Sequence, residues 1–307
     1  MFTFTSITIP NLTNKVQKVD GHAFRHGSDA DIFLGNYQKG DRVASTPVVI
    51  KVVRNIFDEA DAKRLNEKLV REARVWCLLN HQNIVPFLGI SYDLGQHDQP
   101  CLISPFYENG NAIEHLRNNP NANRESLLCQ VAAGLAYLHG QKPPIVHGDM
   151  KGSNILINDR GKACITDFGL SRILETAGFT TKNLKGTTRY IALELITHDS
   201  HDIAPRLTIE TDVWAFGMTG LEILTSQLPF ANLRSDGEVV RHVMKGGTPD
   251  RKAQGMQGEE FAGHWELMKS CWHQDPRKRI PMRVMHEQLV SHQATSSSTS
   301  VSVCCMQ

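Results

Sequence analysis

The stretch "HGDMKGSNILI", which runs from His147 to Ile157, places an aspartate, a lysine and an asparagine just before an apolar run. A second apolar segment, Lys162–Thr166, follows the turn "NDRG" at residues 158–161. Aspartate and glycine favour tight turns, so the pattern predicts a β-hairpin over Asn154–Thr166. Such a hairpin brings Asn154, at one open end, close to Asp167, which lies just beyond the other end.

The same open end gathers further polar side chains. Asp149 and Lys151 lie just upstream of Asn154, so an amide oxygen, two carboxylates and an ammonium group are expected to converge there. Oxygen ligands together with a retained cation suit Mg²⁺ that is bound along with phosphate groups. The alternative is a solvated loop beside a hairpin.

Two more charged residues interrupt apolar patterns. The helix predicted over Asp58–Leu79 carries Glu72 within its apolar face, which is formed by Leu65, Leu69, Trp76 and Leu79. In "PVVIKVV", Lys51 interrupts a β-branched strand. Taken singly, Glu72 could reach water and Lys51 could extend from a sheet edge. Because buried charges are costly unless they are paired, an ion pair between Lys51 and Glu72 would satisfy both.

The coarse pattern predicts a small β-rich N-terminal part and a larger helical C-terminal part, divided near Tyr107–Gly110. Strands are predicted at Asp31–Gln38, Pro47–Val53, Phe87–Tyr92 and Cys101–Pro105. Helices are predicted at Arg124–His139, Asp212–Leu224, Gly237–Lys245 and Phe261–Cys271. Ligands commonly bind in clefts between two such parts.

Composition excludes several classes of protein. The 307 residues carry a formal net charge of +1, so no global basic field attracts nucleic acid or anionic lipid. The seven cysteines form no CxxC pair, which indicates reduced thiols in a reducing compartment. The sequence has no apolar run of about 20 residues and no secretory leader pattern. We therefore expect a soluble, monomeric protein of the cytoplasm or the nucleus, without a membrane span.

These residues, in this order, resemble the signature set of eukaryotic protein kinases, and most closely the tyrosine-kinase-like group. The resemblance covers about Val19–Val290. It rests on "VVIK" with Lys51, Glu72 in the helix, "HGDMKGSN", "DFG" at residues 167–169, "GTTRYIALE", "DVWAFG" and "CWHQDPRKRI". It implies a bilobal α+β fold, with an antiparallel β-rich N-lobe that contains one key helix and a mainly α-helical C-lobe.

The resemblance also implies an activity, in which ATP and Mg²⁺ are cofactors and a protein is the substrate. Asp149 would orient or deprotonate the substrate hydroxyl, and Lys151 would neutralise charge on the transferred group. Lys51, steadied by Glu72, would hold the ATP phosphates. Asn154 and Asp167 would hold the metal ion. Structural support would come from His147, Phe168, Thr187, Glu194 paired with Arg279, and Asp212 beneath the catalytic loop.

The same resemblance assigns the adenine site. Ser104 would guard the back of the pocket, and backbone groups of Pro105 and Tyr107 would bind the adenine edge. Ile32, Val49 and Leu156 would sandwich the ring, although each could equally be ordinary core. Trp76, Phe87, His147 and Phe168 would form an internal hydrophobic column, for which plain core packing is the alternative.

Substrate class and domain limits follow from details of these motifs. Lys151 lies two residues after Asp149, and Thr187 follows Gly186, as in serine/threonine kinases. We therefore expect serine/threonine specificity. The predicted organisation is an extension over residues 1–18, a kinase domain over 19–290 with lobes at about 19–107 and 108–290, and a disordered serine-rich tail over 291–307.

The chain departs from the family pattern in several places. The three usual glycines of the phosphate-covering loop become Arg25, Gly27 and Ala30, which would weaken nucleotide binding because only glycine lets backbone amides approach phosphate closely. For that reason the alternative function is a pseudokinase that acts as an ATP-binding or protein-binding scaffold. Leu193 replaces the proline of "APE", with little expected consequence.

A glycine, Gly148, replaces the arginine that usually contacts a phosphorylated activation segment. We therefore expect activity that does not require phosphorylation of Thr176, Thr180 or Thr181. The last four residues, Cys304 to Gln307, match the pattern of a prenylation box. No basic cluster precedes them and a single lipid anchors weakly, so a disordered end is favoured over prenylation.

Overall fold

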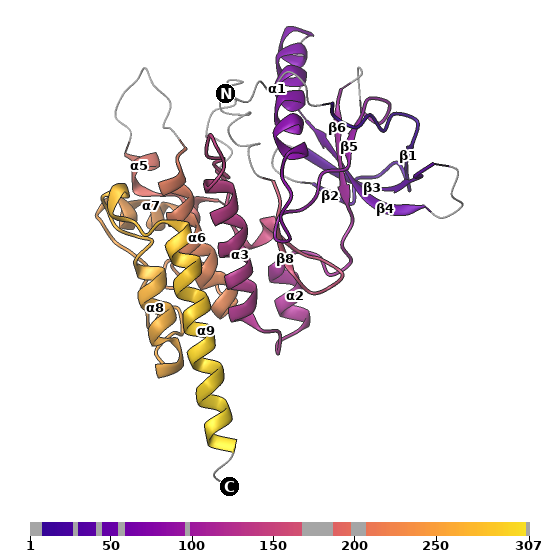
Figure 1. The fold of residues 1–307 in the computed structure, drawn as a ribbon. Coiled ribbons are helices and arrows are strands. Elements are labelled where there is room, and N and C mark those ends of the chain that lie inside the picture. Colours follow the sequence, from indigo (N-terminus) through magenta and orange to yellow (C-terminus); the bar gives the residue numbers. More distant parts are fainter. Residues whose placement is uncertain are drawn as a thin grey trace. The chain divides into compact units, whose positions relative to one another are not determined.

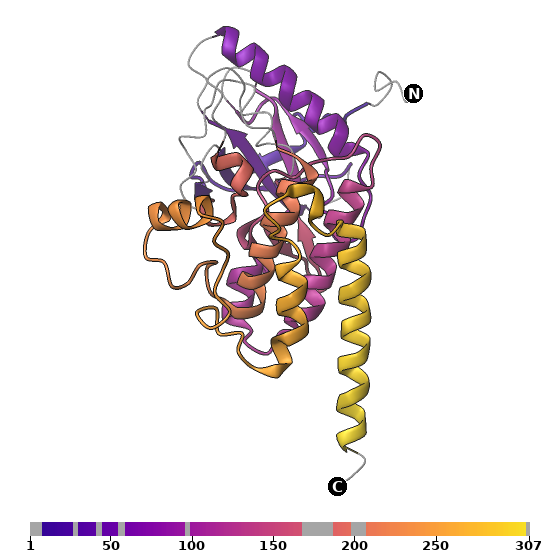
Figure 2. The ribbon, with the colours of Figure 1, turned by 90° about the vertical axis from the view of Figure 1, so that its left-hand side faces the viewer.

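The fold was analysed in a computed structural model of the 307-residue chain. The structure describes residues 8–26, 30–40, 45–54, 59–95, 99–167, 187–197 and 207–304. These residues form two compact units, and the chain passes from the first to the second between Glu108 and Asn109. Figures 1 and 2 show the ribbon of both units.

The first unit is built on an antiparallel sheet with the strand order β1-β3-β4-β6-β5, and β2 pairs with β3. Its elements are β1 (Val16–Lys18), β2 (Arg25–His26), β3 (Ala30–Tyr37), β4 (Thr46–Val53), β5 (Gly89–Ser91), β6 (Cys101–Pro105) and the helix α1 (Glu59–Cys77). The β-branched run of β4 places it at the centre of the sheet, between β3 and β6. The predicted β-rich N-lobe with one helix is therefore present (Figure 1).

Helix α1 buries the face that its sequence pattern predicts. Leu65, Leu69 and Trp76 are at most 9% exposed, and Ala73 joins them. Glu72, within this face, is half-buried. The indole Nε1 of Trp76 donates a hydrogen bond to the Val85 carbonyl oxygen at 2.8 Å, which satisfies the polar atom of this buried ring.

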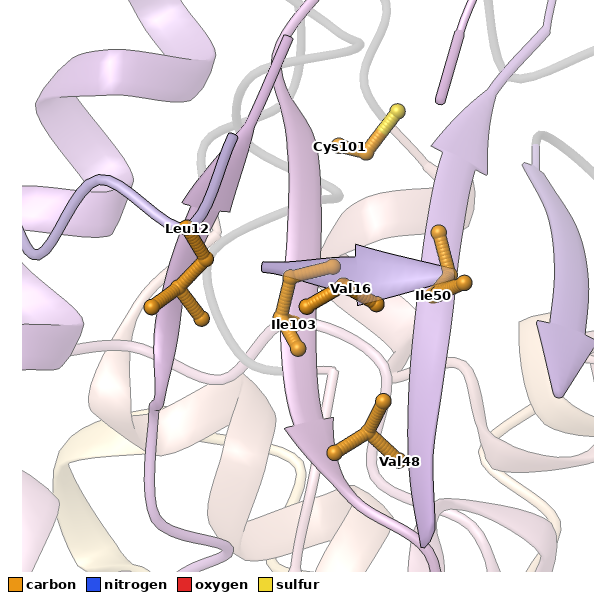
Figure 3. Packing of buried hydrophobic residues seen from close by; sticks show 6 residues of the cluster. All are labelled: Leu12, Val16, Val48, Ile50, Cys101 and Ile103. Atoms are coloured by element: carbon orange, nitrogen blue, oxygen red, sulfur yellow. The ribbon is translucent and has the colours of Figure 1, made fainter. Parts of the chain in front are cut away.

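Part of the expected N-terminal extension over residues 1–18 belongs to the core of the first unit. Leu12 and Val16 pack with Val48, Ile50 and Ile103 on one face of the sheet (Figure 3). The Leu12 amide donates to the Ile90 carbonyl at 2.7 Å, so this segment also pairs with β5. This segment stays packed on the sheet because it covers apolar strand residues that would otherwise face water.

The second unit is mainly helical and surrounds one hairpin. Its longer helices are α2 (Ala112–Asn118), α3 (Arg124–His139), α6 (Ile209–Thr225), α7 (Asp236–Met244), α8 (Ala262–Lys269) and α9 (Met282–Cys304). The hairpin consists of β7 (Ile155–Ile157) and β8 (Ala163–Ile165), and the short helix α5 spans Leu193–Ile196. Helix α6 is buried along its whole length from Thr211 to Leu224, so it forms the centre of this unit (Figure 1).

Helix α9 continues to Cys304, which corrects the disordered tail expected from residue 291 onward. The helix is anchored by buried Met282, Met285 and Leu289, and it then extends past the other helices of its unit (Figure 2). Extending an existing helix costs less than starting one. The Thr295 hydroxyl donates to the His292 carbonyl at 2.8 Å, which shows how hydroxyl side chains are accommodated in this helix. Residues 305–307 of the prenylation box lie outside the described residues.

Within the described part of the chain, no helix combines the length and apolar character that crossing a membrane requires.

Candidate active site

The hairpin of the second unit positions the first group of predicted site residues. Ile155 pairs with Ile165, and beyond this pair the Thr166 amide donates to the Asn154 carbonyl at 3.0 Å. This register places Asn154 beside the residue that precedes Asp167. Asp167 has φ +64, a left-handed conformation that carboxamide and carboxylate residues tolerate better than most.

Asp149, Lys151, Asn154 and Thr187 form a connected polar cluster. The Asp149 carboxylate accepts from Lys151 Nζ at 2.7 Å through Oδ2, and from the Asn154 amide at 2.9 Å through the same oxygen. The Thr187 hydroxyl donates to the other oxygen, Asp149 Oδ1, at 3.2 Å and accepts from Lys151 Nζ at 3.1 Å. Charge-assisted bonds of this kind are short and strong, and they fix the position of the carboxylate. With 25% of its side chain exposed, Asp149 is still accessible from solvent.

Asp212, at the start of α6, holds the loop that carries this cluster. Its two oxygens accept the backbone N–H groups of His147 at 2.7 Å and Gly148 at 2.8 Å. The ring of His139 bonds to the same carboxylate at 2.9 Å. Asp212 is only 1% exposed, so these donors replace the water that a buried carboxylate would otherwise require. Gly148 has φ +81, which suits a glycine at this position.

His147 is held as a neutral ring beneath the same loop. Its Nε2 bonds to the Thr166 carbonyl at 2.9 Å, and its Nδ1 accepts the Asp149 amide at 3.1 Å. This network assigns the proton to Nε2. Burial lowers the pKa of His147, and the nearby carboxylates of Asp212 and Asp149 only partly oppose that effect. His147 therefore links the catalytic loop to the end of the hairpin without carrying charge.

Glu222 on α6 is a site residue that sequence reasoning missed. Its Oε2 accepts the Gly152 amide at 2.9 Å, and its carboxyl group also hydrogen-bonds with Tyr190. Burial raises the pKa of Glu222 despite these bonds. A Cβ atom at Gly152 would lie 2.6 Å from Glu222 Oε2, so a larger residue there would displace the Glu222 carboxyl group. A glutamate within the otherwise apolar α6 sequence was the signal that could have revealed it.

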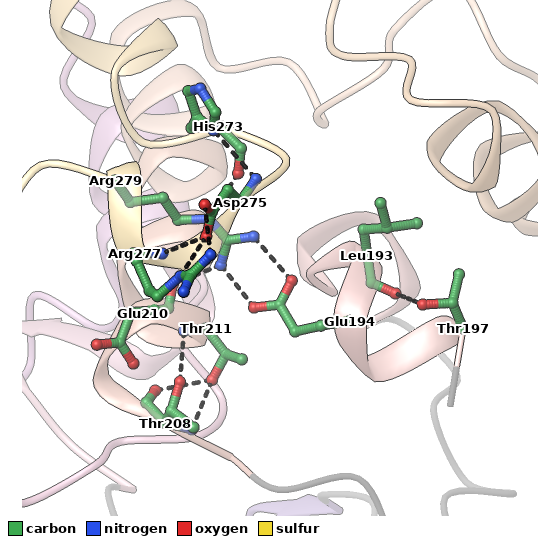
Figure 4. Close-up of polar contacts among 10 residues, drawn as sticks. All are labelled: Leu193, Glu194, Thr197, Thr208, Glu210, Thr211, His273, Asp275, Arg277 and Arg279. Carbon is green, nitrogen blue, oxygen red and sulfur yellow. Dashed lines mark hydrogen bonds and ion pairs between the residues drawn. The ribbon is translucent and has the colours of Figure 1, made fainter. Parts of the chain in front are cut away.

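The predicted pair between Glu194 and Arg279 is present as a bidentate ion pair (Figure 4). The two Arg279 terminal nitrogens lie 2.6 and 2.7 Å from the two Glu194 oxygens. Arg279 also donates to the carbonyls of His273 at 3.0 Å and Glu210 at 2.8 Å. The pair therefore ties α5 to the start of α6 and to the turn before α9.

In the first unit, strand register places several predicted nucleotide-site residues on one face of the sheet. Lys51 pairs with Ile32 on β3 and with Leu102 on β6, and Val49 pairs with Ser104. Directly paired residues point to the same side of a sheet, and successive residues along a strand point to opposite sides. Ile32, Val49 and Lys51 are each half-buried, whereas Val48 and Ile50 on the opposite face are fully buried.

The remaining predicted residues are placed as follows. Pro105 ends β6, and Tyr107 and Leu156 are half-buried. The Trp76 and Phe87 rings stack at 4.7 Å between centroids in the first unit, and His147 is buried in the second. Gly27, Phe168 and the three threonines, Thr176, Thr180 and Thr181, lie outside the described residues. The ion pair between Lys51 and Glu72 stays a prediction.

The side-chain oxygens of Asn154 and Asp167 would suit a magnesium ion that also binds water and phosphate, rather than a metal ion held by protein ligands alone. Among the described residues, no group of three or more histidine, cysteine or acidic side chains could hold a metal ion. Asn154 uses its amide nitrogen to bind Asp149, so its side-chain oxygen is the atom that a metal ion would bind. One or two protein oxygens are enough to bind Mg²⁺, because this ion keeps several waters and binds substrate phosphates as well.

Comparison with known proteins agrees with this arrangement. The family described as "Protein tyrosine and serine/threonine kinase" matches residues 21–289. Wall-associated receptor kinase-like 20 of Arabidopsis thaliana is 34% identical over 58% of this chain and 28% of its own length. Serine/threonine-protein kinase STY46 of the same plant is 26% identical over 93% of this chain and 47% of its own length. Mitogen-activated protein kinase kinase kinase A of Dictyostelium discoideum is 28% identical over 88% of this chain and 27% of its own length. The chain thus spans less than half the length of each of these relatives.

Proposed function

Because this chain belongs to the family of protein tyrosine and serine/threonine kinases, we propose that it transfers the γ-phosphoryl group of ATP to serine and threonine hydroxyls of proteins. The observation that carries the proposal is the cluster in which Asp149 is bonded to Lys151, Thr187 and Asn154. The relatives named as serine/threonine kinases support the same substrate class.

The cluster suits phosphoryl transfer because this reaction needs positioned charges more than covalent chemistry. Asp149 orients the substrate hydroxyl and accepts its proton through a carboxylate that Asn154 and Thr187 hold in place. Lys151 neutralises charge on the transferred group, and its bond to Thr187 keeps the ammonium near the reacting oxygen. Asp212 supports both by fixing the backbone of the loop.

We propose further that Asn154 and Asp167 hold Mg²⁺ and that Lys51, paired with Glu72, holds the ATP phosphates. Bound Mg²⁺ would supply neutralisation of the phosphate charges. The half-buried Ile32 and Val49 lie on the same sheet face as Lys51, which supports a role in covering the adenine ring. The resemblance of the motifs to those of tyrosine-kinase-like kinases is the basis on which we propose assignment to that group.

A pseudokinase is the second candidate, because two of the three usual glycines of the phosphate-covering segment are replaced, by Arg25 and Ala30. Ala30 carries a side chain that is buried at 4% exposure, and Arg25 lies on β2 opposite Ile32. Side chains at these positions keep backbone amides farther from a phosphate. Under this alternative, the chain binds ATP or a protein without transferring phosphate.

The two candidates are separated by one matched pair of variants. Asp149→Asn removes the carboxylate of the cluster, and Asp159→Asn removes an exposed carboxylate from the turn of the adjacent hairpin. Phosphoryl transfer from Mg-ATP to a generic protein substrate should fall by about 10²-fold or more in Asp149→Asn and stay unchanged in Asp159→Asn. Nucleotide binding without transfer in the wild type would favour the scaffold. Label found only on tyrosine would reject the serine/threonine assignment.

A further inference from the structure

Arg189 makes an unusually complete set of contacts for a residue with no assigned role. It lies in the short turn Thr188–Tyr190, and 13% of its side chain is exposed. One terminal nitrogen donates to the carbonyls of Pro229 at 2.7 Å and Phe230 at 3.0 Å. The other donates to the Leu233 carbonyl at 2.9 Å, and Nε lies 3.6 Å from Asp236 Oδ1. The guanidinium therefore organises the loop between α6 and α7.

That loop is strained at the point where Arg189 binds it. Phe230 has φ +58, which is an outlier for a bulky side chain, and the residue is only 1% exposed. Its carbonyl accepts from Leu233 N at 2.9 Å as well as from Arg189. The next amide, Ala231 N, donates to the buried Gln254 side chain at 2.9 Å. A conformation of this kind persists only where surrounding contacts determine it, and such positions cluster at functional sites.

The turn that carries Arg189 also carries Thr187. The Tyr190 amide donates to the Thr187 carbonyl at 2.9 Å, which closes the turn around Arg189. The Thr187 hydroxyl in turn bonds to Asp149 and Lys151. The loop between α6 and α7 is thereby connected to the polar cluster through one arginine and one threonine.

We propose that Arg189 is a positioning residue for phosphoryl transfer, which acts by holding Thr187 against Asp149 and Lys151. This inference rests on the proposed kinase activity. Arginine suits the task because its planar fork donates to several carbonyls at fixed angles, whereas lysine offers a single flexible ammonium group. Displacement of reacting groups by about 1 Å is enough to cost roughly 10²-fold in rate.

The test compares Arg189→Ala with Arg189→Lys and with a control, Arg283→Ala, which removes an exposed arginine from its pair with Glu287 on α9. In Arg189→Ala, kcat should fall by about 10²-fold while the affinity for a non-hydrolysable ATP analogue stays unchanged. Arg189→Lys should recover part of this loss, and Arg283→Ala should match the wild type.

A double variant tests whether the effect passes through threonine. If Arg189 acts by placing Thr187, then Arg189→Ala combined with Thr187→Ala should be no slower than Thr187→Ala alone. Additive losses, or an unchanged kcat in Arg189→Ala, would overturn the inference. Hydrogen exchange of the Tyr190 amide should accelerate in Arg189→Ala and not in Arg283→Ala, and this readout needs no catalysis. An inactive wild type would therefore reject the proposed function alone, whereas unchanged exchange at Tyr190 would reject the role of Arg189.

Discussion

We predict that loss of the ion pair between Glu194 and Arg279 strongly destabilises the second unit. The Arg279 side chain is 0% exposed and the Glu194 side chain is 29% exposed. Substitution of Glu194 by alanine would leave the guanidinium buried, with two of its N–H groups unpaired. Removing one partner of a buried pair typically costs about 3–5 kcal/mol, because the remaining charge has lost its compensation.

The geometry narrows that range. Glu194 is partly solvated, so part of its attraction for Arg279 is screened by water, and we take the lower end, about 3 kcal/mol. The carbonyls of His273 and Glu210 still accept from Arg279 in the variant, which prevents complete loss of its bonds. A change of about 3 kcal/mol lowers the ratio of folded to unfolded molecules by roughly 10²-fold.

The chain contains two compact units, so the assay should report on the second unit alone. Hydrogen exchange of the slowest amides of α6, which is buried along most of its length, gives the free energy of unfolding for that unit. Glu194→Gln, which keeps one acceptor oxygen, should lose less than Glu194→Ala. The double variant Glu194→Ala with Arg279→Met should lose less than the sum of the two single losses. If Glu194→Ala lowers the free energy of unfolding by less than about 1 kcal/mol, the ion pair does not stabilise this unit as predicted.

Three further predictions concern the catalytic loop. Burial lowers the pKa of His147. Below about pH 6.5, His147 therefore binds a proton more readily in the unfolded chain than in the folded chain. The free energy of unfolding should therefore fall as pH drops through 6.5, by up to about 1.4 kcal/mol per pH unit, and His147→Gln should show a shallower slope. Gly148→Ala should lose about 1–2 kcal/mol because φ is +81, whereas Gly237→Ala, with open space around its Cβ position, should lose none. Gly148 lacks the guanidinium group with which arginine at this position would bind a phosphorylated activation segment. Transfer activity should therefore be retained when Thr176, Thr180 and Thr181 are all replaced by alanine.

The elements with a strong period or a clear turn signal could be predicted from the sequence. The helix over Arg124–His139 and the strand over Cys101–Pro105 have the predicted limits. The hairpin was predictable because Asp159 and Gly161 mark its turn between two apolar runs. Helix α6 begins at Ile209 rather than at the predicted Asp212, because the Thr208 side chain accepts from Thr211 N and caps the helix earlier.

Contacts between distant segments were harder to anticipate. Leu12 and Val16 lie in a polar, aperiodic stretch, and nothing local indicates that they cover the sheet. The helical continuation past residue 291 depends on anchoring by the preceding residues of α9 rather than on the propensity of its serines.

The candidate site divides in the same way. Asp149, Lys151 and Asn154 were predictable because they share one loop, and Glu194 with Arg279 because the resemblance named the pair. Glu222 and Arg189 were missed because their roles depend on partners 70 and 44 residues away at Gly152 and Leu233. Sequence spacing gives no measure of such approaches.

We have proposed that Lys51 holds the phosphates of ATP and that Asn154 and Asp167 hold Mg²⁺. The most direct measurement is an experimental structure of the protein with Mg²⁺ and a non-hydrolysable ATP analogue. We expect Lys51 Nζ within hydrogen-bonding distance of an α- or β-phosphate oxygen, and side-chain oxygens of Asn154 and Asp167 on the metal ion. A nucleotide bound elsewhere, or phosphates that contact none of these three side chains, would contradict this proposal.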